Sequence, residues 1–549
     1  MTARLLDRGP LVAAACAAQV AALTVAPSAL AVDVEVSNDT TFQAYEVMNP
    51  WSTFSLERRR ITEQLGFSLY HLQGDYSPGK ADYTMRISLR LDADPGVNAH
   101  LPDAQAGGET DFSIDGGSRY VPDLAYVDLN LMYAYVEGRN LANGWLGFKV
   151  GRQYQTDALG WWSFDGGLIR LTTPAFFELE AYGGLEQRGG LPLSSTRFEP
   201  QGVWRGSHAD FGDEAQDPRA IDYPSYQFAA PAPAFGFAAE TNGPNWLHAR
   251  VSYRRVYQTG EALLNQLGTP PGGTTALSGV RLSSDRLGGA ANVEIFKIGG
   301  LKGGFNYDLY SKVFSYGFAG LEAYLGKKVT IGADFDYYEP TFDADSIFNW
   351  FSKQPHMTAT ARLEARPTKK FDLSASGGAK VFFTAGDPDT YFVGECAQAA
   401  NPACTIDAGL DVAINDAVRA YSADPANNER TAQAGGIGQL AGRYRVPHGK
   451  FELRSMAEVG PRGRRVGGDL SGEGTLVGGK WAFGGRVSLY NWHDPTREDR
   501  DATSFGYVLA AAWKPLDLSK IGVEWEHDYN ALVGQRFRVL GSLNVLWIK

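Results

Sequence analysis

Apolar and polar residues alternate one by one along much of the chain, the pattern of a β-strand whose two faces meet different surroundings. In residues 83–91 the odd positions are Tyr, Met, Ile, Leu and Leu, whereas the even positions are Thr, Arg, Ser and Arg. One face of this segment is therefore apolar and the other is cationic. The same alternation is found in segments that begin near residues 65, 127, 247, 329, 371, 505 and 537.

These alternating segments are too long for an ordinary soluble sheet. They run for roughly 9 to 14 residues, whereas strands in soluble proteins average about five or six. A tilted strand needs about 9–11 residues to cross a membrane. The pattern predicts an all-β transmembrane antiparallel β-barrel rather than the alternative, a soluble β-sandwich or propeller. Aromatic residues also end many of the apolar faces, as in the girdles of outer-membrane barrels: Tyr83, Tyr135, Tyr253, Tyr337, Trp513 and Trp547.

We expect about 18 strands, within a range of about 16–22, because single-chain bacterial barrels have an even number of strands. The alternation is weakest in residues 168–173 and 279–286. Three stretches show no strand pattern and are expected to form long extracellular or inward-folding loops: residues 93–120, 185–246 and 385–432. Short breaks at residues 366–369 and 514–517 are typical of periplasmic turns.

Composition and charge exclude two other classes of protein. The net charge is −11, with 62 acidic and 51 basic residues, and such a balance does not favour binding to nucleic acid. The mean hydropathy of −0.25 excludes a polytopic helical membrane protein. It does not exclude a barrel, because the two faces of alternating strands average out.

The start of the chain has the features of a bacterial secretory signal peptide. Two arginines precede an apolar stretch, and Ala29 and Ala31 supply the small residues that signal peptidase recognises. We therefore expect residues 1–31 to be removed and residues 32–549 to form the barrel.

Two loop-like segments carry further candidate residues. Cys396 and Cys404 lie in a segment rich in Ala, Asn and Pro, and an oxidising compartment favours a disulfide between them. The second segment combines an acidic residue with aromatic residues, and we interpret it either as a constriction loop or as a plug that packs against the barrel wall: Asp345, Phe348, Trp350 and Phe351.

A barrel of 16 or more strands encloses water rather than a packed core. Charged residues on the polar faces of its strands are then solvated in the lumen and influence which ions or solutes pass. The candidates for lining the pore are Arg86, Arg90, Lys149, Arg152, Asp165, Arg170, Arg250, Arg254, Asp334 and Asp336.

Residues 127–186 resemble part of the porin-like and alginate-export-like outer-membrane barrels of Gram-negative bacteria. The resemblance rests on a strand that ends in Gly-Arg-Gln, followed by Phe-Asp-Gly at the next strand: Gly151, Arg152, Gln153, Phe164, Asp165 and Gly166. It implies an outer-membrane channel with Arg152 near the lumen wall.

The histidines offer no recognisable catalytic or metal-binding pattern. None of the eight has His-x-x-x-His spacing, no Cys-x-x-Cys pair is present, and the Gly-x-Ser-x-Gly elbow of hydrolases is missing. His527 is flanked by Glu524, Glu526 and Asp528, which we interpret as a polar lumen or rim face. We therefore expect no enzymatic activity, no cofactor and no metal.

Together these features predict an outer-membrane channel that lets small hydrophilic solutes or ions pass. The alternative is export of an extracellular polysaccharide, in which case a periplasmic partner is expected because the chain shows no separate periplasmic domain. A structural barrel with a blocked lumen and an outer-membrane enzyme are less favoured. The expected partners are outer-membrane lipid and the solute or polysaccharide, together with a homotrimeric assembly or the export partner, but not nucleic acid.

Overall fold

The structure, a computed structural model, describes residues 32–48, 54–74, 77–93, 128–187, 232–258, 262–263, 276–277, 280–310, 312–341, 355–385, 430–461, 463–493, 501–530 and 534–548. Three predictions concern residues outside these ranges. They are the signal peptide, the disulfide between Cys396 and Cys404, and the constriction loop with Asp345, Phe348, Trp350 and Phe351.

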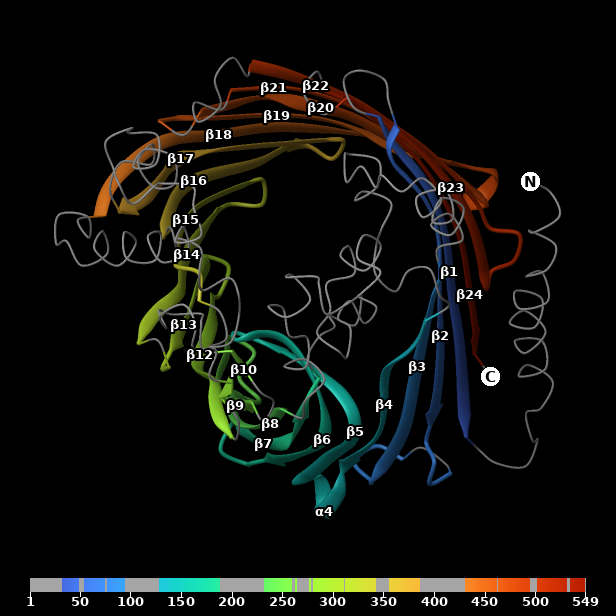
Figure 1. Cartoon of the computed structure of the whole chain (residues 1–549), viewed down its shortest axis with the longest axis vertical. Coiled ribbons are helices and arrows are strands. Elements are labelled where there is room, and N and C mark those ends of the chain that lie inside the picture. The colour runs from blue at the N-terminus through green and yellow to red at the C-terminus, as the bar shows by residue number, and fades with distance from the viewer. Residues whose placement is uncertain are drawn as a thin grey trace.

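The described strands form one closed antiparallel barrel of 22 strands (Figure 1). Each strand of the ring pairs with the next one along the chain, and the ring closes where β1 pairs with β24. The first half of the ring contains β1 (Asp33–Met48), β2 (Phe54–Tyr70), β3 (Asp82–Ala93), β4 (Asp128–Asn140), β5 (Leu146–Asp157), β6 (Gly160–Thr172), β7 (Phe177–Glu186), β8 (Ala232–Thr241), β9 (Leu247–Gln258), β12 (Arg281–Ile295) and β13 (Gly299–Asp308). The second half contains β14 (Val313–Leu325), β15 (Val329–Tyr338), β16 (His356–Thr368), β17 (Phe371–Ala385), β18 (Arg430–Val446), β19 (Gly449–Gly460), β20 (Gly463–Leu476), β21 (Trp481–His493), β22 (Asp501–Trp513), β23 (Ser519–Asn530) and β24 (Gly534–Ile548).

A few short elements lie outside the ring. β10 (Ala262–Leu263) and β11 (Ala276–Leu277) pair with each other. The turn α4 (Leu141–Gly144) connects β4 to β5, and the 3₁₀ turn η8 (Val477–Gly479) connects β20 to β21. In the part of the chain that the structure describes, no helix is long and apolar enough to span a bilayer.

The number of strands lies at the upper end of the expected range and above the expected 18. The two segments with weak alternation belong to β6 and β12. The expectation of a loop over residues 185–246 is wrong for residues 232–241, which form β8. Most inward-facing positions of β6 and β8 carry apolar or small side chains, with Arg170 and Glu240 as exceptions near the short-turn end. These strands therefore largely lack the alternation by which the others were found.

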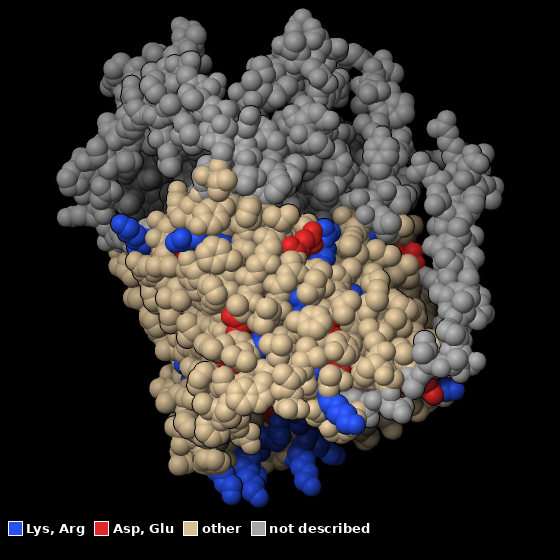
Figure 2. Space-filling view, turned by 90° about the horizontal axis from the view of Figure 1, so that it is seen from below, with Lys and Arg blue, Asp and Glu red and all other residues tan. Residues whose placement is uncertain are grey.

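Large apolar side chains cover the outer face of the barrel. Leu440, Leu453 and Leu509 are each more than half exposed, as expected of a surface that contacts lipid. In Figure 2 the outer surface is a mostly uncharged belt, with Lys and Arg side chains projecting at its lower end. Aromatic side chains lie at this end as well, where Trp481 stacks on Trp513 with ring centroids 5.7 Å apart.

The two ends of the barrel differ in the length of their connections. At one end, which we call the short-turn end, neighbouring strands are joined by tight turns such as residues 326–328 between β14 and β15. The predicted breaks at residues 366–369 and 514–517 both fall at turns of this end. The opposite, long-loop end carries the connections that span residues 94–127 and 386–429.

Part of the wall folds inward and forms a small second ring, which we call the inner lobe and which contains β5–β9 and β12 (Figure 1). At the tip of the β5–β6 hairpin, Leu159 lies against Gly288 of β12, so closely that a Cβ on this glycine would be 2.7 Å from Leu159 Cδ2. The barrel therefore holds a packed apolar core beside its charged wall, which the prediction of a water-lined interior did not include. This core consists of Trp162, Phe164, Leu168, Tyr182, Ala232, Ala234 and Val256.

Candidate functional site

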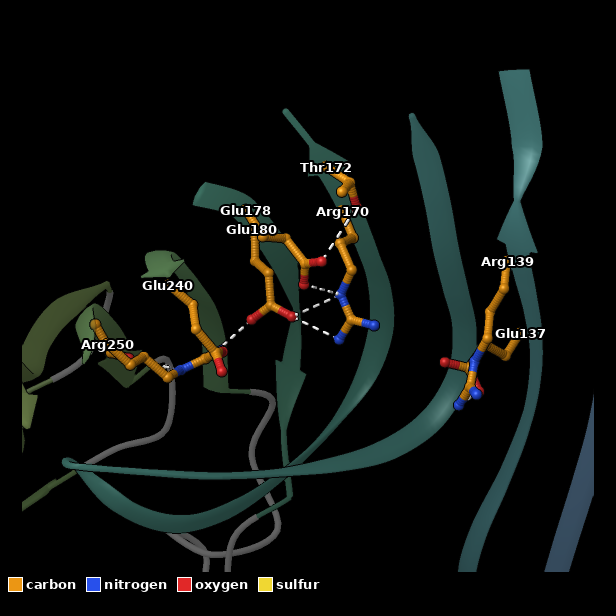
Figure 3. A network of polar contacts seen from close by, with 9 residues as sticks. Glu137, Arg139, Arg170, Thr172, Glu178, Glu180, Glu240 and Arg250 are labelled. Atoms are coloured by element: carbon orange, nitrogen blue, oxygen red, sulfur yellow. Dashed lines mark hydrogen bonds and ion pairs between the residues drawn. The ribbon is translucent and has the colours of Figure 1, made fainter. Parts of the chain in front are cut away.

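Charged side chains on the inner face are joined into ion-pair networks that cross neighbouring strands. In the network of Figure 3, Arg170 on β6 contacts Glu178 and Glu180 on β7, each at 2.7 Å. Arg250 on β9 contacts the same Glu180 and also Glu240 on β8, the latter at 2.6 Å. The side chain of Glu180 is only 2% exposed, so its negative charge depends on the two arginines that it connects.

Similar networks continue around the wall. On β13–β16, Asp334 contacts Lys302 at 2.8 Å and Arg362 at 3.3 Å. On β23 and β24, Arg536 contacts Glu526 at 2.7 Å. Positive and negative charges thus alternate along the described inner wall, so it is polar and largely charge-balanced rather than strongly cationic.

Sequence analysis missed most of the partners in these networks. They occupy the polar positions of the same alternating strands, and the signal that could have found them is the strand register, which brings opposite charges side by side. The missed residues are Glu178, Glu180, Glu240, Lys302, Glu322, Arg362, Arg536 and Arg538.

The strand register places most of the predicted pore-lining residues on the inner face, although their surroundings differ. Arg86 lies over the ring of Tyr70 at 5.2 Å. Arg254 is 5% exposed and lies over the ring of Trp162 at 5.1 Å, so it belongs to the core of the inner lobe. The residues that share the inner-face register are Arg86, Arg90, Lys149, Arg170, Arg250, Arg254, Asp334 and Asp336.

Arg152 and Asp165 lie on the opposite face of β5 and β6 from the other predicted residues of these strands, and they pair with each other. The Arg152 guanidinium donates from Nε and Nη2 to the two carboxylate oxygens of Asp165, at 2.7 and 2.8 Å. Gln187 donates a further hydrogen bond of 2.5 Å to this carboxylate.

The face that carries Arg152 turns toward the interior because β5 curls into the inner lobe. Tyr154, on the same face as Arg152, packs against Tyr133 of β4 with ring centroids 5.8 Å apart. Tyr133 is paired with Ser88, and both belong to the inner face. In a regular barrel wall, by contrast, the face with Arg152 would meet lipid.

His527 does not share a face with its acidic neighbours. Its ring stacks on Phe537 at 4.3 Å and meets Tyr507 at 5.4 Å, both on the outer face, while Glu526 points inward to Arg536. The interpretation of this cluster as a polar lumen or rim face therefore does not hold for the His527 ring as a lumen-facing group, whereas Glu526 does face the interior. Among the described side chains, no group of three or more His, Cys, Asp or Glu is arranged to hold a metal ion.

The barrel has no free edge between its first and last strands, is apolar outside and carries charges inside. In a bilayer, closure satisfies the backbone hydrogen bonds, and the apolar outer face matches the hydrocarbon. The chain is a closed antiparallel β-barrel with the surface pattern of a barrel that spans a membrane.

Comparisons with solved structures found barrels of low sequence identity. The outer membrane protein OpdK of Pseudomonas aeruginosa is 10% identical over 94% of this chain and 99% of its own, with a TM-score of 0.38. OccK9 (OpdG) of the same organism is 9% identical over 94% and 98%, with a TM-score of 0.40. OccAB1 of Acinetobacter baumannii is 9% identical over 94% and 96%, with a TM-score of 0.38. No protein-family model and no curated protein matches the chain.

Proposed function

We propose that the barrel is a channel through which small hydrophilic solutes or ions cross the outer membrane. The observation that carries this proposal is the exposure of charged side chains on the inner face of a closed ring. The side chains of Lys302 and Arg536 are 50% and 52% exposed. Charges remain on such a wall only where water solvates them, which supports a hydrated path through the barrel.

The arrangement of the inner charges also bears on selectivity. Because opposite charges are paired across strands, the field along the wall is small compared with that of a row of like charges. We therefore expect weak ion selectivity, set by the more exposed members of the networks, and a transport function rather than an enzymatic one.

Single-channel recording tests this proposal. The mature barrel, residues 32–549, is refolded into planar bilayers, and its conductance is measured first in salt alone and then with sugars or small organic anions. We expect steady, ohmic conductance that some of these solutes reduce. An electrically silent barrel would contradict a passive channel.

Polysaccharide export is the alternative proposal, and a different experiment separates the two. Deletion of the gene removes surface polysaccharide if the barrel exports it, and leaves the polymer coat unchanged if the barrel is a solute channel. Export also predicts that a periplasmic protein is recovered with the barrel from detergent-solubilised membranes.

A further inference from the structure

We propose that the mouth of the barrel at the short-turn end binds small anions that carry several charges, as solutes with two or more phosphate or carboxylate groups do. The inference rests on the proposed channel function and narrows its class of solute. Three lysines on neighbouring strands carry it, and we call them the lysine row: Lys480, Lys514 and Lys520.

Positive charge is concentrated in one set of connections at the short-turn end. The six connections that join β12 to β13, β14 to β15, β16 to β17, β18 to β19, β20 to β21 and β22 to β23 contain seven lysines and one acidic residue, Asp517. The chain as a whole has a net charge of −11. Figure 2 shows basic side chains projecting from the barrel at this end. The seven lysines are Lys297, Lys327, Lys328, Lys369, Lys370, Lys480 and Lys514.

The inner lobe does not share this charge. Its strands are joined at the short-turn end by residues 141–145, 173–176 and 242–246, and none of these residues is charged. The excess of lysine therefore belongs to the part of the wall outside the lobe, on one side of the mouth.

The strand register turns the lysine row toward the interior. Trp513 of β22 is paired with Ile521 of β23, and both side chains are exposed on the outer face. Lys514 and Lys520 are their neighbours along the two strands and so point to the opposite face. Pro515 disfavours helical backbone at Lys514, which therefore keeps the extended backbone of the strand before it.

The three lysines lie side by side. The Lys514 N–H donates to the Lys480 carbonyl oxygen at 2.8 Å, so these two residues are opposite each other just beyond the last pair of β21 and β22. Continuing the register of β22 and β23 places Lys514 beside Lys520. Residues directly opposite each other on neighbouring strands have Cβ atoms about 4.5–5.5 Å apart, and like charges in that position repel.

Other cations at this end have an acidic neighbour. Arg366 lies beside Lys328, to whose carbonyl oxygen its N–H donates at 2.7 Å, but Arg366 Nε also contacts Asp372 at 2.8 Å. Within the described ranges, no carboxylate forms an ion pair with the lysine row, and Lys520 is paired on its other side with the neutral Asn544. The repulsion within the row is thus left for an anion from solution to relieve.

The position of the row favours a solute over a membrane lipid. Outward positions at the same height carry Trp481 and Trp513, whose stacked rings face the bilayer. The lysines occupy the other face and are exposed to solvent. Short turns are periplasmic in barrels of this type, so the row would meet anions that enter from the periplasm. Because each exposed charge pair contributes little on its own, an anion with several charges binds better than one with a single charge.

Equilibrium binding tests this site. The probe is tripolyphosphate, titrated calorimetrically into the detergent-solubilised barrel at low ionic strength, where exposed charges are least screened. We expect the combined variant Lys480→Gln, Lys514→Gln and Lys520→Gln to bind tripolyphosphate about tenfold or more weakly, because three charge contacts are lost. The variant removes repulsion between like charges, so its barrel should fold as before.

The matched control removes three cations from the long-loop end: Lys312→Gln, Lys380→Gln and Arg465→Gln. It changes the net charge by the same amount and should leave the affinity for tripolyphosphate unchanged. Equal weakening in both variants, or none in the lysine-row variant, overturns the site. Benzene-1,3,5-tricarboxylate replaces tripolyphosphate in a second arm, so that the tighter of the two probes identifies phosphate or carboxylate as the preferred group. Benzoate, with one charge, should bind much more weakly than either.

Single-channel recording separates the site from the channel. Tripolyphosphate is added to one chamber at a time, and we expect it to block the current at a lower concentration from one side than from the other. The lysine-row variant should lose this difference between sides, and the long-loop control should keep it. Block that is equal from both sides of the unchanged barrel contradicts the site. A barrel that binds tripolyphosphate through the row but conducts no ions would contradict the channel and leave the site in place.

Discussion

At the scale of single residues, the inner-face charges differ in how far they depend on their partners. Glu180 is nearly buried between Arg170 and Arg250, whereas Glu240 of the same network is 46% exposed. A buried charge that loses its partners stays desolvated, whereas an exposed one is solvated by water. Neighbouring carboxylates in one network therefore contribute to stability to different extents.

We predict that Glu180→Gln destabilises the barrel by about 1–3 kcal/mol, because two arginines lose a charged acceptor. Glu240→Gln should lower the free energy of unfolding by only about 0–1 kcal/mol, because an exposed ion pair contributes little to stability. The free energy of unfolding of both variants is measured by guanidinium denaturation in lipid vesicles. Equal losses would contradict the central role of Glu180.

Exposure also decides which positively charged side chains influence ion transport. We predict that Lys302→Gln shifts the reversal potential in a salt gradient toward cation selectivity, because a half-exposed positive charge is lost from the wall. Arg254→Gln should leave the reversal potential unchanged, since Arg254 lies in the core of the inner lobe. A shift of equal size in both variants would place Arg254 beside the ion path.

At the scale of elements, the inner lobe converts a two-faced sheet into a small packed domain. Trp162 of β6 packs against Tyr182 of β7 with ring centroids 4.7 Å apart and lies under the guanidinium of Arg254 of β9, instead of facing water.

We predict that Trp162→Ala lowers the free energy of unfolding by about 3–5 kcal/mol, as expected when a large aromatic side chain is removed from a core. The control is Phe237→Ala, whose side chain faces outward and is exposed, so it leaves no internal cavity. Unfolding transitions measured in vesicles compare the stability of the Trp162→Ala and Phe237→Ala variants. A small effect of Trp162→Ala would mean that the lobe contributes little to the stability of the barrel.

At the scale of the whole molecule, the two faces of the barrel have opposite requirements for charge. Adjacent residues of one strand point to lipid and to the interior, so the same substitution has different consequences at neighbouring positions. Leu509 and Val508 on β22 are such a pair. Leu509 is exposed on the outside, and Val508 is paired with Arg486 and Glu526 on the inner face.

We predict that Leu509→Arg destabilises the inserted barrel by about 2–4 kcal/mol, the cost of a cation near the bilayer midplane. Val508→Arg should be tolerated, because its charge would lie beside Glu526 and water. The yield of folded barrel in vesicles and its unfolding midpoint report the difference. If Val508→Arg were the more harmful variant, the assignment of the two faces would be reversed.

The sequence by itself determined which positions of most strands face lipid and which face the interior. Alternation is a local property with a period of two residues, so residues 83–91 and 505–513 were assigned without knowledge of their neighbours. The same rule failed for β6 and β8, where most interior positions are apolar or small because they pack within the lobe.

Only the tertiary structure decided which charges meet and where the wall folds inward. These features depend on register between strands, and register is set by contacts between residues far apart along the chain. Arg170 and Arg250, for example, share Glu180 although Arg250 is 70 positions from it. Local alternation identifies both arginines as polar positions of strands, but their common partner exists only once β6 to β9 have closed around it.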